Sequence, residues 1–153
     1  MNTPHTQATL EIRPSLVDIK QSEDRVKSLI EQLSGVTRLL NLAVSEESDT
    51  AEQNILNGIL ALKTILDTAF HQDLEKAGFY LDQAQWILEM LLYKLNEAEC
   101  SEYDKHIYLS VAGLETLVGA ALQAQSEYEQ LMLDVSRHSK ACEADLGEAK
   151  EPA

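Results

Sequence analysis

Apolar residues recur three and four positions apart along most of this chain, which is the spacing of one face of an α-helix. Four such segments follow one another: the first over about residues 14–44, the second from about residue 50, the third ending near residue 97, and the fourth beginning near residue 101. Proline, the strongest helix breaker, is confined to positions 4, 14 and 152. The pattern predicts an all-α fold.

Each segment carries its own apolar seam. In the first the expected seam is Val26, Leu29, Leu33, Val36, Leu40 and Ala43. In the second it is Ile55, Ile59, Leu62, Leu66 and Ala69. In the fourth it is Ile107, Val111, Leu114, Val118, Ala121, Gln125, Tyr128, Met132 and Val135.

The segment boundaries follow from capping residues and helix breakers. Pro14 suits a first helical turn, although Ser22 with the two acids after it offers a second start. Asp49 with Glu52, and Ser101 with Asp104, resemble capping pairs that open the second and fourth helices. The end of the second helix stays open between three alternatives: a stop near His71, a stop at Ala77 with Gly78 as terminator, or one helix continuing through residues 50–98.

Short connections make successive helices antiparallel neighbours, so we expect an up-down-up-down four-helix bundle with long first and fourth helices. The predicted organisation is a flexible arm over residues 1–13, one bundle domain over 14–141 and an acidic, disordered tail over 142–153. Since the two long helices meet at their far ends, we expect the first helix to cover part of the fourth there. The expected covering residues are Leu16, Val17 and Ile19, and the covered ones are Leu131, Met132 and Val135.

The third segment is apolar on two opposite faces. One face carries an unbroken repeat, Leu74, Ala77, Leu81, Ala84, Leu88, Leu91 and Leu95. The other carries Phe79, Trp86, Met90 and Tyr93, a set we call the aromatic stripe. A surface helix needs only one apolar face, so the stripe is either ordinary core or a surface for a partner. We favour a partner, because a four-helix bundle has no central helix.

Charge is the second candidate for a functional signal. The formal net charge is −14, and residues 45–153 carry all of the excess, with 21 acids against seven bases. Such a chain repels phosphate backbones, so we expect no direct nucleic-acid binding but a possible partner with a basic surface. In an up-down bundle the first and third connections share one end, where the acids of an expected acidic pole gather: Glu46, Glu47, Asp49, Glu52, Glu97, Glu99, Glu102 and Asp104.

Catalytic and metal-binding patterns are not found in the sequence. His71, His106 and His138 each follow an acid by four positions, a spacing typical of helix surface pairs rather than of a ligand set. We therefore expect no catalytic residues, no metal and no cofactor. Gly113 and Gly119 are interpreted as places where another helix approaches closely, and Gln125 as a polar seam residue that fixes register or oligomeric state.

Three functional hypotheses follow. The first is a non-catalytic protein–protein interaction module that self-associates, as a dimer, through the aromatic stripe. The second is an acidic inhibitor or regulator, a nucleic-acid mimic of the kind phages and mobile elements encode, which occludes the basic surface of a nucleic-acid-binding enzyme. The third is a metal-binding bundle or enzyme. With no apolar leader, no uncharged run of the ~18–20 residues that span a bilayer, and only Cys100 and Cys142, we expect a cytoplasmic chain that does not bind membranes.

Overall fold

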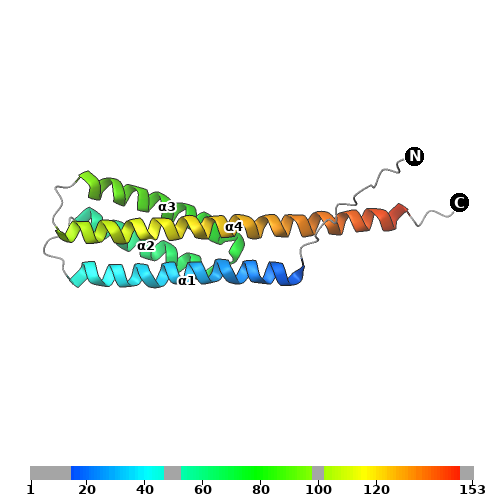
Figure 1. Cartoon of the computed structure of the whole chain (residues 1–153), viewed down its shortest axis with the longest axis horizontal. Helices are drawn as coiled ribbons and strands as arrows, with labels where there is room; N and C mark the ends of the chain where they lie inside the picture. The colour runs from blue at the N-terminus through cyan, green and yellow to red at the C-terminus, as the bar shows by residue number, and fades with distance from the viewer. Residues whose placement is uncertain (1–14, 47–52, 98–101, 149–153) are drawn as a thin grey trace, which may run out of the picture.

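The computed structural model describes residues 15–46, 53–97 and 102–148 and contains four helices in these ranges. They are α1 (Leu16–Glu46), α2 (Gln53–His71), α3 (Leu74–Glu97) and α4 (Glu102–Glu148). Successive helices run in opposite directions, and each packs against its two neighbours in a ring (Figure 1). The predicted antiparallel four-helix bundle is confirmed. The arm over residues 1–13, the capping pair at Asp49 and Glu52, and Ser101 lie outside the described residues.

Helix α1 begins with a reciprocal cap between Ser15 and Asp18. The Ser15 hydroxyl accepts from the Asp18 backbone N–H at 3.1 Å, and the Asp18 carboxylate accepts from the Ser15 N–H at 2.8 Å. The hydrogen bond from the Ser15 backbone lowers the pKa of the Asp18 carboxyl, followed by that from the Ser15 hydroxyl. The helix therefore starts at Leu16, and the alternative start at Ser22 is wrong. Pro14, expected in the first turn, lies outside the described residues.

Helix α2 ends at His71, and a short turn leads directly into α3. The carbonyl of Asp73 accepts from the N–H groups of Lys76 at 2.9 Å and Ala77 at 3.1 Å, which opens the next helix. The stop near His71 is therefore confirmed, and both alternatives are wrong. Gly78 is an ordinary residue inside α3, because no described glycine has a positive φ.

The core runs along the centre of the ring and uses the predicted seams of α2 and α3, and that of α4 as far as Gln125. Beyond Gln125 the α4 prediction is wrong, because Met132 is exposed and Tyr128 and Val135 are only half-buried where α4 leaves the bundle.

In α1 the seam differs, because Val36 and Ala43 are exposed whereas Ile30, Thr37 and Val44 are buried. Helix α1 has apolar residues on adjoining faces, so two overlapping seams satisfy the same three-four spacing. The fully or almost fully buried apolar side chains of α1 are Val26, Ile30, Leu33 and Val44.

A polar cluster around Asp67 ties α1 to α2. One carboxylate oxygen accepts from the buried hydroxyl of Ser34 at 2.6 Å and from Arg38 at 3.1 Å, and the other lies 3.4 Å from the Lys63 ammonium. Burial tends to raise the pKa of Asp67, but the hydrogen bonds from Ser34 and Arg38 and the charge of Arg38 outweigh it. The pKa therefore lies below its ordinary value, and the carboxylate stays charged.

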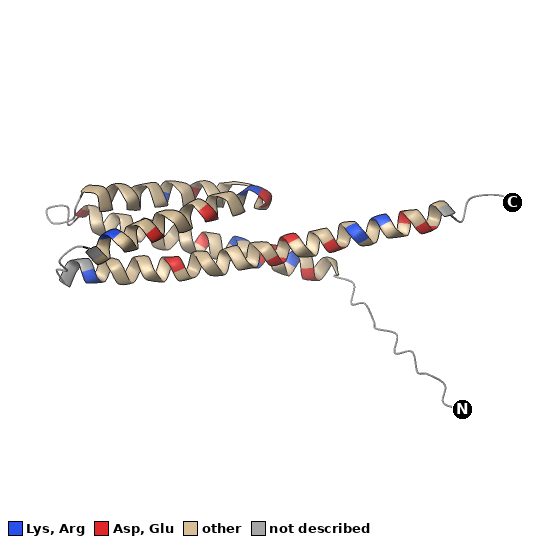
Figure 2. Cartoon of the chain, turned by 90° about the horizontal axis from the view of Figure 1, so that it is seen from above, with Lys and Arg blue, Asp and Glu red and all other residues tan. Residues whose placement is uncertain are grey.

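Helix α4 projects beyond the rest of the bundle (Figures 1 and 2). The turn between α2 and α3 lies level with Tyr128, and the helix continues to Glu148. Residues 142–148 are thus helical where we expected a disordered tail, and residues 149–153 lie outside the described part.

The expected cover of this projecting part by the start of α1 is wrong in part, since Leu131 and Val135 are half-buried as expected. Leu16 and Val17 are exposed, and Met132 is exposed too. Helical periodicity supplies the reason, since Ile19 lies two turns before the buried Val26 and faces the same way, whereas Leu16 and Val17 point elsewhere. Ile19 alone of the three is half-buried.

Candidate functional site

The two apolar faces of helix α3 lie in different surroundings, one in the core and the other exposed to solvent. The regular repeat from Ala77 to Leu95 is buried in the core. On the opposite face the exposed fractions are 62% for Phe79, 64% for Trp86, 48% for Met90 and 62% for Tyr93. The interpretation of the stripe as ordinary core is therefore wrong. That the stripe binds a partner stays a prediction.

The aromatic stripe rests on a rigid support. Tyr80 and Ile87 lie half-buried beside it and pack against the core, and the ring of Phe79 meets that of Tyr80 edge-on with centroids 5.5 Å apart. The backbone beneath is held at Gly58, where an added Cβ would lie 2.6 Å from the end of the Leu91 side chain. The four large side chains thus stand on a helix clamped to α2, which suits a surface that binds with little rearrangement.

The expected acidic pole is described only in part. The ends of α1 and α3 and the starts of α2 and α4 lie at one end of the bundle (Figure 1), as the topology requires. Glu46 is exposed there. The backbones of Glu97, Glu102 and Asp104 belong to the helix ends at this pole. Glu47, Asp49, Glu52 and Glu99 lie outside the described residues, so the gathering of these carboxylates stays a prediction.

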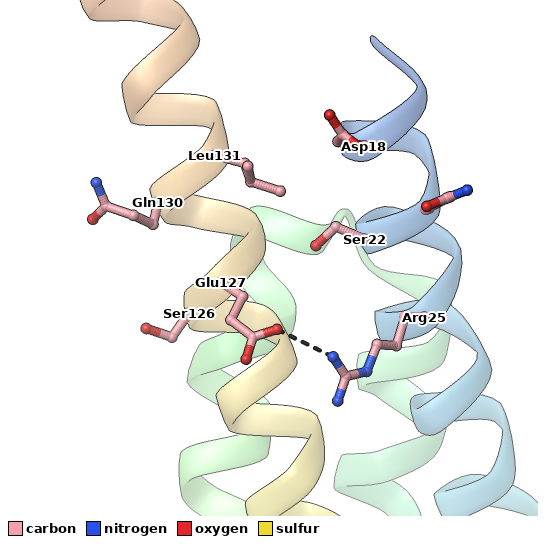
Figure 3. Close-up of a pocket in the computed structure, with 8 residues that line it drawn as sticks. Asp18, Ser22, Arg25, Ser126, Glu127, Gln130 and Leu131 are labelled. Carbon is pink, nitrogen blue, oxygen red and sulfur yellow. Dashed lines mark hydrogen bonds and ion pairs between the residues drawn. The ribbon is translucent and has the colours of Figure 1, made fainter. Parts of the chain in front are cut away.

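A groove between α1 and α4 was not anticipated from the sequence. Its lining comes from the first turns of α1 and from α4 near its departure from the bundle: Asp18, Gln21, Ser22, Arg25, Ser126, Glu127, Gln130 and Leu131. In Figure 3, Leu131 and Ser22 point into the gap, whereas Ser126 and Gln130 point away from it. No sequence signal marks this groove, because it depends on how far the two helices separate.

The side chains that line this groove are mostly polar. Arg25 and Glu127 form an ion pair at 3.1 Å across it, and both side chains are largely exposed (Figure 3). An exposed pair of this kind contributes at most about 1 kcal/mol. The lining provides hydroxyls and amides but no histidine or cysteine to activate or serve as a nucleophile.

The histidines and cysteines do not come together in the described part of the chain. His71 and His106 are exposed on different helices, and His138 lies on the projecting part of α4. In that part of the chain no three His, Cys, Asp or Glu side chains could hold a metal ion. Cys142 is an exposed free thiol, and Cys100 lies outside the described residues.

The interpretations of the small and polar residues of α4 change with the structure. Gly113 and Gly119 face open space, so none of the four described helices approaches them closely. Gln125 is buried and its amide donates to the carbonyl of Leu74 and to Glu129, while its own oxygen has no partner. The hydrogen bond to Leu74 ties α4 to the start of α3, and an effect of Gln125 on register or oligomeric state stays a prediction.

Helix α4 also contains a stretch, within Lys105–Gly147, that is long and apolar enough by composition alone to cross a membrane. One third of that stretch is buried in the bundle. Core helices of water-soluble bundles meet the same criterion because their buried seam is apolar.

Comparison with known proteins adds no relative. No protein-family model matches the chain, and no curated protein or solved structure is significantly similar to it.

Proposed function

We propose that this chain is a non-catalytic protein–protein interaction module that works through the aromatic stripe and associates with further copies of itself. The observation that carries the proposal is the exposure of Phe79, Trp86, Met90 and Tyr93 on the face of α3 opposite the core. Exposed apolar residues are common singly, but four large ones in a row over about four helical turns are typical of a binding surface. Trp and Tyr also dominate the energetics of protein interfaces.

Folding does not require these side chains, which makes the proposal testable without unfolding the protein. Trp86→Ser is expected to leave the free energy of unfolding within about 0.5 kcal/mol of wild type, as exposed substitutions usually do. Leu88→Ala, on the buried face of the same helix, is expected to cost about 2–5 kcal/mol. Denaturant unfolding of both variants checks this separation of roles.

The function itself is tested by sedimentation equilibrium of wild type and Trp86→Ser. We expect wild type to self-associate and Trp86→Ser to be shifted strongly towards monomer. Leu133→Ser is the matched control, since it removes another exposed large apolar residue, on α4. Loss of association in both variants, or in neither, would contradict a specific role of the stripe.

A pull-down from lysate at low and high salt separates the remaining partners. A protein captured by wild type and lost with Trp86→Ser supports the interaction module with a foreign partner. Capture of a basic nucleic-acid-binding enzyme by both variants, at low salt only, would instead favour the acidic regulator, because exposed charges are screened beyond about 8 Å at physiological ionic strength.

A further inference from the structure

The two sides of the aromatic stripe carry opposite charges. At about 100° per residue, Lys76 and Lys94 lie on the side of α3 that faces α2, where Leu91 meets Gly58. Asp82 and Glu89 lie on the side that faces α4, where Gly78 meets Gln125. All four charged side chains are exposed. Among the described residues no ion pair includes any of them.

The surface next to the lysines continues onto α2 without a carboxylate. The outer face of α2 presents Asn57, Ala61, Thr64 and Thr68. The only acid of this helix, Asp67, is bound to Ser34 and Arg38 on the α1 side. In a chain of net charge −14 this is a surface on which a second, equally acidic copy meets little repulsion.

We propose, resting on the proposed function, that the partner of the stripe is the stripe of a second copy, with the two α3 helices parallel and related by a twofold axis along them. In this arrangement Phe79, Trp86 and Tyr93 of one copy pack against the same residues of the other. Glu89 of each copy lies opposite Lys94 of the second copy.

The charges on the two sides of the stripe favour a parallel over an antiparallel pair of α3 helices. A twofold axis parallel to the helices sets the α2 side of one copy against the α4 side of the other, so lysines face carboxylates along both edges. An antiparallel pair sets like sides together, and lysines then face lysines while acids face acids. Glu89 also precedes Lys94 by five positions, the offset that joins flanking charges across parallel paired helices.

Charge reversal tests the pairing. In sedimentation equilibrium, Glu89→Lys and Lys94→Glu are each expected to raise the dimer dissociation constant about tenfold, because each puts like charges opposite each other twice. The double variant Glu89→Lys/Lys94→Glu is expected to return within about twofold of wild type. A mixture of the two single variants should form mixed dimers in preference to either homodimer.

Matched controls carry the same change of net charge elsewhere. Glu31→Lys on α1 and Lys140→Glu on α4 are exposed and lie away from the stripe. At about 150 mM salt, where long-range repulsion is screened, both are expected to leave the dissociation constant within about twofold of wild type. Tighter association of Glu89→Lys would overturn the parallel arrangement in favour of the antiparallel one, and so would a double variant no better than the singles.

Disulfide trapping tests the register independently. Gln83 follows Phe79 by four positions and precedes Trp86 by three, so it belongs to the three-four repeat of the stripe, and in the parallel pair it faces Gln83 of the second copy. In a Cys100→Ser/Cys142→Ser background, Gln83→Cys is expected to form a disulfide-linked dimer on mild oxidation. Ser28→Cys, exposed on α1, should remain a monomer. No crosslink at Gln83→Cys would contradict the register.

The outcomes for the pairing and for the module are distinguishable. A wild-type chain that stays monomeric overturns the pairing, yet Trp86-dependent capture of a foreign protein would leave the interaction module standing. Association that is insensitive to Trp86→Ser overturns both. Association lost with Trp86→Ser but indifferent to charge reversal overturns the pairing alone.

Discussion

Asp67 shows how a single residue sets the geometry between two helices. Its carboxylate binds Ser34, Arg38 and Lys63, and so joins α2 to two turns of α1. A buried hydroxyl such as that of Ser34 needs a partner, and the carboxylate supplies one. The hydrogen bonds of this cluster favour one rotation of α1 about its own axis. The apolar pattern of α1 alone leaves that rotation open.

Replacing this carboxylate should therefore destabilise the bundle in a pH-dependent way. Asp67→Asn is expected to cost about 1–3 kcal/mol at neutral pH. Because the pKa of Asp67 is lowered in the folded state, this contribution is present above the unfolded-state pKa of about 3.9 and is lost as the pH falls through the folded-state pKa. Denaturant unfolding of both proteins between pH 7 and pH 3 should show the difference shrinking only below about pH 4. Asp145→Asn, exposed on the projecting helix, should show neither effect.

Two glycines are expected to respond to alanine with opposite signs. Gly113 faces open space inside α4, so Gly113→Ala should stabilise by about 0.5–1 kcal/mol through helix propensity. At Gly58 the new Cβ would lie 2.6 Å from one Leu91 carbon and 3.2 Å from another, within the core. Gly58→Ala should therefore destabilise by about 1 kcal/mol net of its propensity gain. Thermal unfolding followed by circular dichroism checks both, and equal shifts would contradict the close α2–α3 approach.

At the scale of the helices, the apolar spacing predicted the buried face of a helix where only one face fitted the spacing. It failed where two faces fitted it. The seams of α2 and α3 could be predicted because each helix has one continuous apolar repeat. The opposite face is polar in α2, and in α3 it carries the separate aromatic stripe. In α1, Val36 and Leu39 adjoin the seam and are exposed, so spacing alone could not set its rotation. The groove beside Arg25 could not be predicted, since it depends on the separation of two helices and not on any residue pattern.

Helix α4 divides into a part that belongs to the bundle and a part that does not. Its last buried side chains are Ala124 and Gln125, and the helix continues to Glu148. Deleting residues 137–153 should therefore leave the free energy of unfolding within about 0.5 kcal/mol of wild type. Deleting residues 125–153 removes the Gln125 amide that binds the Leu74 carbonyl and should destabilise the bundle clearly. If the deletion of residues 137–153 melts the bundle, the projecting part of α4 supports it.

At the scale of the whole molecule, the net charge opposes the contact that the aromatic stripe favours. Each copy carries a formal charge of −14, and those charges lie mostly off the α2 side of the stripe. Apolar contact is nearly independent of salt, whereas repulsion between two acidic bodies falls as salt screens it. Self-association and binding to a basic surface therefore depend on salt with opposite sign.

Raising the ionic strength from about 10 mM to about 150 mM shortens the screening length from about 30 Å to about 8 Å. We expect this step to tighten self-association several-fold, and further salt to change it little, because only the long-range repulsion is removed. Sedimentation equilibrium of wild type across this range checks the sign, with Trp86→Ser as the control that should stay shifted towards monomer throughout. Weakening with salt would mean that attraction between charges, and not the stripe, holds the copies together.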